Sequence, residues 1–215
     1  MKQPQLNIDI NIVEYGKSNI ILKDISFRIE NNGIYGVFGK NGQGKSTFLK
    51  TIAGLKTYKG EINFNHKKLE PHQIAYIGTE PNVYEYLTAR EFYKFYEKVS
   101  GRKIINQDHK IFDIDENTIL KSMSTGTLKK AYINAILQFS DYDIYIFDEP
   151  FNGLDIESNY VLIEKLKELS QSKIVFISSH ILEVIQPFLD GIFFVNDKTI
   201  KEINTKELIK NLQNK

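Results

Sequence analysis

The sequence predicts an α/β fold: a mostly parallel sheet flanked by helices, with an N-terminal antiparallel β-subdomain and an inserted helical subdomain. Three observations lead to this prediction. Continuous apolar runs alternate with helical patterns, as expected of parallel strands that are buried on both faces. Near the N-terminus, apolar and polar residues alternate strictly, which indicates half-buried strands. A segment with aromatic residues near helical spacing interrupts the series of strands.

The N-terminal strands are predicted from their period of two. Every second residue from Leu6 to Ile12 is apolar, and the same pattern returns at residues 25–29. We expect these two strands to be antiparallel and joined by a turn at residues 14–19. Residues 60–65 predict a further short strand, so the first part of the chain forms the β-subdomain.

Longer apolar runs predict the buried strands of the main sheet, at residues 32–38, 143–150 and 173–180. Helical patterns lie at residues 45–53, closed by Gly54, at 155–170, started by Asp155, and after Asn204, where Glu207 completes a capping box. Residues 191–200 predict a closing hairpin. The segment 79–128 is predicted to form the inserted helical subdomain, so that residues 1–78 and 129–215 make up the core with its β-subdomain.

The composition is that of an ordinary globular domain, with 41% hydrophobic and 26% charged residues among 215. The 28 basic and 27 acidic side chains nearly balance, which argues against nucleic acid as the main ligand. Lysine pairs such as Lys129 and Lys130 are expected to be solvated surface. Cysteine is absent, which excludes disulfides and cysteine-based zinc sites. No run approaches the ~18 apolar residues of a membrane span, and residues 1–10 lack the apolar region of a signal peptide.

A glycine-rich stretch, GKNGQGKST, follows one predicted buried strand and precedes a predicted helix. It matches the pattern G-x-x-x-x-G-K-[ST], whose glycines let successive N–H groups converge on a phosphate at the N-terminus of the helix. Lys45 is expected to reach the β- and γ-phosphates, and the Ser46 hydroxyl to ligate Mg²⁺. The sequence thus predicts a nucleotide-binding phosphate loop of the P-loop NTPase type, made of Gly39, Lys40, Asn41, Gly42, Gln43, Gly44, Lys45, Ser46 and Thr47.

A second predicted strand ends in Asp148, Glu149 and Pro150. An aspartate at the tip of a buried strand beside a phosphate loop is expected to hold Mg²⁺, usually through water. Glu149 would then face the attacking water as a general base. Considered without the loop, an acidic turn at the end of a strand explains these residues equally well.

The phosphate loop, YIFDEPFNGLD and VFISSH follow one another in an order that resembles the nucleotide-binding subunit of an ATP-binding-cassette (ABC) transporter, over essentially the whole chain. The resemblance implies ATP and Mg²⁺ as cofactors and ATP hydrolysis with Glu149 and His180 as catalytic residues. It also assigns single positions: Tyr15 stacks on adenine, Ser124 and Gly126 belong to the signature (MSTGT here), Asp155 couples two sites across a dimer, and His180 senses the γ-phosphate.

The same resemblance implies partners. The signature would face the phosphate loop of a second subunit, so that each ATP is sandwiched between two protomers; we expect a homodimer, with a heterodimer as the alternative. A membrane-spanning transporter subunit would hold the protein peripherally at the inner, cytoplasmic face of the cell membrane. An aromatic-lined groove could bind a helix of that partner, or the same rings could fill the core of the subdomain: Tyr84, Tyr86, Phe92 and Tyr93.

The chain departs from the family pattern at two places. Thr79 stands where the family has a glutamine that helps to arrange Mg²⁺ and water; we expect Thr79 to act through a bridging water, or Glu80 to replace it. In the signature, Thr125 and Thr127 replace a glycine and a glutamine, which affects the expected activity more than the identity of the site.

Two alternative functions stay open: a soluble ABC ATPase that acts on DNA or ribosomes, and a nucleotide-gated interaction subunit with low turnover.

Overall fold

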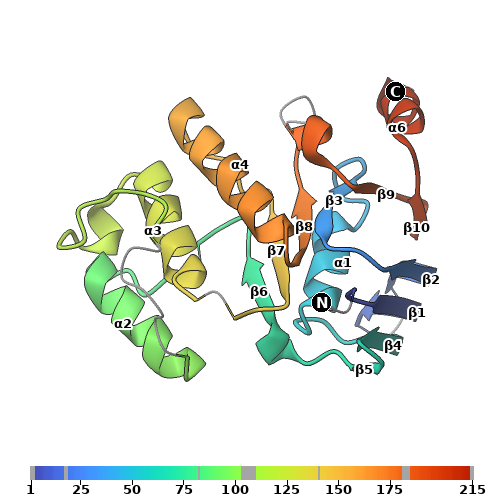
Figure 1. Cartoon of the computed structure of the whole chain (residues 1–215), viewed down its shortest axis with the longest axis horizontal. Coiled ribbons are helices and arrows are strands. Elements are labelled where there is room, and N and C mark those ends of the chain that lie inside the picture. The colour runs from blue at the N-terminus through green and yellow to red at the C-terminus, as the bar shows by residue number, and fades with distance from the viewer. Residues whose placement is uncertain are drawn as a thin grey trace.

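The computed structural model describes residues 3–16, 19–81, 83–102, 110–139, 141–180 and 185–213, so the turn predicted at residues 14–19 lies partly outside the described residues. The main sheet has the strand order β10-β9-β3-β8-β7-β6, and its strands are parallel except for β10. This arrangement confirms the predicted α/β fold (Figure 1). The strands are β3 (Gly33–Phe38), β6 (Ile74–Ile77), β7 (Ile144–Asp148), β8 (Ile174–Ser178), β9 (Gly191–Asn196) and β10 (Thr199–Glu202).

A second, antiparallel sheet has the order β2-β1-β4-β5 and packs beside the first. Its strands are β1 (Leu6–Tyr15), β2 (Asn19–Ile29), β4 (Lys59–Phe64) and β5 (Lys67–Lys68). The alternation predicted from Leu6 holds as far as Ile10, but Ile12 is only half-buried and Val13 is buried in its place. The prediction for Ile12 is wrong because the pairing of β1 with β4 shifts register between Ile10 and Ile12.

Helices α1 and α4 pack on opposite faces of the main sheet, because its strands are apolar on both faces. Ile144 and Ile146 of β7 share a core cluster with Phe48 of α1, whereas Tyr145 and Phe147 share another with the α4 helix. The strand is therefore buried on both sides, as its continuous apolar run predicts. The helices are α1 (Lys45–Ile52), α2 (Ala89–Ser100), α3 (Thr125–Leu137), α4 (Ile156–Ser170) and α6 (Thr205–Gln213), with single 3₁₀ turns at Pro71–Gln73, Leu120–Ser122 and Gln186–Phe188.

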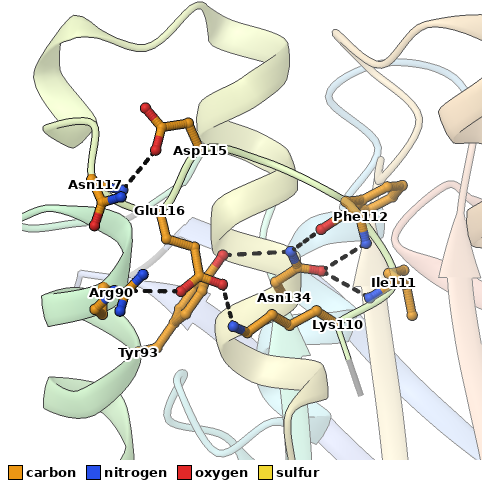
Figure 2. Close-up of polar contacts among 9 residues, drawn as sticks. All are labelled: Arg90, Tyr93, Lys110, Ile111, Phe112, Asp115, Glu116, Asn117 and Asn134. Carbon is orange, nitrogen blue, oxygen red and sulfur yellow. Dashed lines mark hydrogen bonds and ion pairs between the residues drawn. The ribbon is translucent and has the colours of Figure 1, made fainter. Parts of the chain in front are cut away.

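Helices α2 and α3 lie side by side at the end of the molecule opposite the antiparallel sheet (Figure 1). Thr88 begins α2 with a capping box to Glu91. Asn134 of α3, only 1% exposed, holds the segment that leads back to α3: its Oδ1 accepts hydrogen bonds from the amides of Ile111 and Phe112, both at 3.1 Å (Figure 2). Its Nδ2 donates to the Phe112 carbonyl at 2.8 Å. One buried amide thus fixes a loop to the helix that begins at the predicted signature.

Strand β6 is absent from the predictions, since an apolar run of four residues is too short to stand out. It pairs in parallel with β7, with Tyr76 opposite Ile146, and it ends just before Thr79. Its position brings the entry to the helical segment close to the acidic end of β7. Among the described residues, no helix is long and apolar enough to cross a membrane.

Candidate functional site

The predicted phosphate loop connects β3 to α1, at the carboxyl edge of the main sheet. Gly39 has no room for a side chain, because an added Cβ would lie 2.4 Å from the Val195 carbonyl oxygen. Lys45 is 8% exposed, and its Nζ donates to the carbonyl oxygens of Gly39 at 2.8 Å and Lys40 at 3.3 Å. Burial lowers the pKa of Lys45, while Glu149 and Asp148 oppose this shift. The ammonium therefore lies within the loop and in the field of both acids.

The carboxylate of Asp148 gathers hydroxyl groups from three other elements. Its Oδ1 accepts hydrogen bonds from Ser46 Oγ of α1 at 3.1 Å and from Ser178 Oγ of β8 at 2.7 Å. Its Oδ2 accepts a hydrogen bond from the Tyr76 hydroxyl of β6 at 3.1 Å. Burial, and then the adjacent Asp148, raise the pKa of Tyr76 far above its ordinary range, so this hydroxyl stays a donor. The sequence reasoning found Ser46 and Asp148 but missed Tyr76 and Ser178.

The donor set at this position suits Mg²⁺, because the ion prefers hard oxygen ligands such as a hydroxyl and a carboxylate. Ser46 Oγ and Asp148 Oδ1 lie close enough for one ion to touch both or to reach one through water. No group of three or more His, Cys, Asp or Glu side chains that could hold a metal occurs in the described ranges. Phosphate oxygens and water would therefore complete the coordination, as is usual for nucleotide-bound Mg²⁺.

Thr79 is half-buried, and among the described residues its side chain makes no hydrogen bond to Ser46 or Asp148. Its carbonyl oxygen instead accepts a hydrogen bond from Lys129 Nζ at 3.1 Å. The hydroxyl that does reach Asp148 from this part of the chain belongs to Tyr76. The role of Thr79 at the metal stays a prediction.

Glu149 follows β7 with a φ of 52°, a left-handed conformation that is uncommon outside glycine. Its amide donates to Ser178 Oγ at 2.9 Å, and its side chain lies beside His180. The His180 amide donates to Glu149 Oε2 at 3.2 Å, and His180 Nε2 lies 3.0 Å from Oε1. Burial raises the pKa of the Glu149 carboxyl, whereas His180 and Lys45 oppose this rise. A carboxylate with a raised pKa is suited to accept a proton from water.

A second group of predicted residues lies at the N-termini of α3 and α4. Ser124 is exposed and caps α3, where its Oγ accepts a hydrogen bond from the Thr127 amide at 3.2 Å. Gly126 lies against the loop after β7, because an added Cβ would be 2.7 Å from the Gly153 carbonyl oxygen. Asp155 caps α4 through the Ser158 amide at 2.8 Å.

A salt bridge joins the two helix starts of this group. Asp155 Oδ2 lies 2.7 Å from Lys130 Nζ of α3. The hydrogen bonds from Lys130 and Ser158 lower the pKa of Asp155. The carboxylate is therefore charged at neutral pH while it links α3 to α4.

Tyr15 ends β1 near the start of α1. Its ring is 45% exposed, and the ammonium of Lys56 lies 3.9 Å from the ring centroid. Hydrogen bonding to Lys56, and more weakly to Thr47 of the phosphate loop, lowers the pKa of Tyr15. The ring is thus accessible beside the phosphate loop, which is compatible with the predicted stacking on a base.

The sequence model of the ABC transporter family matches residues 22–152. The lantibiotic transport ATP-binding protein SrtF of Streptococcus pyogenes is 32% identical over 216 residues, which cover 93% of this chain and 92% of that protein. The ABC transporter ATP-binding protein NatA of Bacillus subtilis (strain 168) is 30% identical over 193 residues, covering 81% and 78%.

Solved structures agree in fold. An ATP-binding subunit of an ABC transporter has a TM-score of 0.82 at 22% identity, covering 96% of this chain and 92% of that one. A dimeric ATP-binding cassette in a post-hydrolysis state, bound to ADP and Pi, has a TM-score of 0.79 at 20% identity, covering 93% and 98%. Together with the family match over residues 22–152, these likenesses show that the chain belongs to the ABC transporter family, as one of its ATP-binding subunits.

Proposed function

We propose that this subunit binds and hydrolyses Mg-ATP and that hydrolysis drives a separate membrane-spanning partner. The observation that carries the proposal is the cluster at the ends of β7 and β8, where Asp148 gathers hydroxyl groups and Glu149 lies beside His180. A subunit that only bound nucleotide to control an interaction would not need a buried glutamate with a raised pKa at this position.

In the proposed reaction, main-chain amides of the loop at residues 39–47 and the Lys45 ammonium bind the phosphates. Ser46 and Asp148 would hold Mg²⁺, which supplies charge neutralisation on the phosphate oxygens when it is bound. Glu149 takes a proton from the attacking water at a carboxylate oxygen. His180, whose Nε2 lies 3.0 Å from Glu149 Oε1, would orient that carboxylate and contact the γ-phosphate.

We propose that two copies of the chain form the complete site. Ser124 is exposed at the start of α3, so its hydroxyl and the nearby amides are available to a phosphate of a partner's nucleotide. A two-fold symmetric pair would supply two such sites, with Asp155 at the start of α4 close to the junction. ATP would then hold the closed dimer, and hydrolysis would release it.

A groove of about 890 Å³ separates the core from the helical segment and supports a partner site. Its lining includes Leu55, Tyr84 and Phe95, and it extends to Ser46 and Asp148 of the metal site. We propose that a short cytoplasmic helix of the membrane-spanning partner binds here and keeps the subunit at the inner face of the cell membrane.

The four aromatic residues first considered for this groove fall into different places. Tyr84 and Phe92 line it. Tyr93 is 5% exposed and belongs to the core, while Tyr86 is 77% exposed and its hydroxyl accepts a hydrogen bond from Lys121 at 3.1 Å. The groove and the core therefore account for Tyr84, Phe92 and Tyr93, whereas Tyr86 lies in neither, and for that residue both predictions are wrong.

The substitution Glu149→Gln tests the proposed function. It should lower the ATP turnover number by at least roughly 100-fold, the contribution expected of a general base, while ATP binding is retained. Light scattering should then show an ATP-dependent dimer. Lys165→Met is the control, because Lys165, whose side chain is 12% exposed, pairs with the exposed Glu168 on α4 and, among the described residues, has no contact with those of the proposed site, so turnover should be unchanged. Undiminished turnover in E149Q, or a monomer at saturating Mg-ATP, would contradict the proposal.

A further inference from the structure

Lys129 carries an ammonium group into the interior. The residue lies on α3 and is 1% exposed, whereas the sequence predicts solvated surface for this pair of lysines; for Lys129 that prediction is wrong. Its neighbour Lys130 does reach the surface, where it pairs with Asp155. Because a buried cation is costly unless it is paired with polar groups, the hydrogen-bond partners of Lys129 Nζ indicate the role of this residue.

The ammonium of Lys129 is bound by two main-chain carbonyl groups, neither of which belongs to its own helix. Nζ donates to the Glu149 carbonyl oxygen at 2.8 Å and to the Thr79 carbonyl oxygen at 3.1 Å. The carboxylates of Glu149 and Asp148 add favourable charge nearby. One side chain thus joins the signature helix, the entry to the helical segment and the residue proposed as general base.

Each joined segment is one whose placement matters for hydrolysis. Helix α3 begins at Ser124, the residue proposed to reach a partner's nucleotide. Thr79 occupies the junction where the family's glutamine is missing and lines the partner groove. Glu149 is left-handed, with φ 52°, a conformation that persists only where surrounding contacts hold it, so a hydrogen bond to its carbonyl group helps to fix the backbone from which its side chain leaves. A second donor to this carbonyl, the Asn152 amide, is more distant, at 3.4 Å.

We propose that Lys129 is a positioning residue that couples the orientation of Glu149 to the seating of α3 and of Thr79. When α3 is packed against the turns at Thr79 and Glu149, the Lys129 ammonium holds the Glu149 carbonyl group and thereby restrains the Glu149 carboxylate. When α3 moves away, that restraint is lost. The inference rests on the proposed function, because it concerns the hydrolytic residue of the same site. It also gives position 79 a role through its main-chain carbonyl group, which is present whatever the side chain there.

The test compares Lys129→Met, which keeps the apolar stem but removes the donors, with Lys129→Arg, which keeps charge and donors. Lys165→Met is the control for loss of a lysine on a neighbouring helix. K129M should lower the turnover number at least tenfold and change the KM for ATP and the affinity for ATP less than twofold, since its two carbonyl partners lie outside the phosphate loop. K129R should recover a large part of the turnover, and K165M should match the unmodified protein.

Hydrogen–deuterium exchange of the nucleotide-free proteins gives a second readout that does not need activity. K129M, but not K165M, should speed exchange in peptides that cover residues 79–81 and 149–153. Turnover within twofold of the unmodified protein in folded K129M would overturn the inference. So would a joint loss of turnover and ATP binding that K129R does not restore, since this indicates a merely structural role.

The two proposals can fail separately. If the unmodified protein hydrolyses no ATP, the proposed function fails, and the exchange experiment alone decides the role of Lys129. Faster exchange at both segments in K129M then supports the link between them, and unchanged exchange overturns it.

Discussion

Replacing Ser178 with alanine should destabilise the protein and impair hydrolysis, because the hydroxyl serves both acidic residues. It donates to Asp148 Oδ1 at 2.7 Å and accepts from the Glu149 amide at 2.9 Å, and the residue is fully buried. A hydrogen bond to a charged group contributes about 1.5–3 kcal/mol, and an unpaired buried amide costs about 1–3 kcal/mol. Asp148 keeps its bonds from Ser46 and Tyr76, so the lower part of each range applies. We expect a loss of roughly 3 kcal/mol in the free energy of unfolding.

Denaturant titration and thermal unfolding measure this loss, which should lower the melting temperature by roughly 6–12 °C for a chain of this size. Ser170→Ala is the control: within the described part of the chain its hydroxyl bonds only to the Lys167 carbonyl at the end of α4, so its cost should stay below about 1 kcal/mol. At a temperature where both variants are folded, S178A should also lower the ATP turnover number at least roughly tenfold, because the Glu149 amide loses its anchor. If S178A were as stable as S170A, the assigned bonds would not exist in solution.

Two further predictions follow from the hydroxyl groups of tyrosines. Tyr76→Phe removes one donor to Asp148 and should raise the half-saturating Mg²⁺ concentration for ATP hydrolysis roughly tenfold, whereas unchanged Mg²⁺ dependence would exclude a role at the metal. Burial raises the pKa of further tyrosines to about 12, namely Tyr35, Tyr93, Tyr132 and Tyr142. Because these groups ionise near pH 10 in the unfolded chain, their contribution to stability is complete below about pH 10 and is lost toward pH 12. The melting temperature should therefore fall between about pH 10 and pH 12, and the phenolate absorbance of these four tyrosines should appear only as the protein unfolds, in addition to that of accessible tyrosines such as Tyr15.

The main elements of the fold were predictable because their signals are local. Continuous apolar runs predicted β3, β7 and β8, and the phosphate loop lies between its strand and helix as expected. Local signals failed where the register between strands decides burial. Ile12 illustrates this, since the shift in the β1–β4 pairing, which no pattern in the sequence marks, turns Val13 inward instead.

The site was predictable to the extent that it consists of short motifs. Ser46, Asp148 and Glu149 lie in such motifs, whereas Tyr76 contacts Asp148 from 72 positions away and Lys129 contacts Glu149 from 20. Tyr76 reaches Asp148 of the proposed metal site only because β6, a strand of four residues, pairs with β7. For Lys129 the sequence pattern points to the surface, since lysine side chains are rarely buried, and only the packing of α3 against two turns reverses that expectation.

The close approach at Gly126 has a consequence for the design of mutagenesis. Even an alanine at this position would push α3 away from the Gly153 carbonyl group, before any nucleotide is present. Inactivity of a Gly126 variant would thus report a displaced helix, and it would say little about contact with a phosphate. Ser124→Ala leaves that backbone spacing intact; because the same hydroxyl caps α3, its effect on turnover is to be compared with its effect on stability.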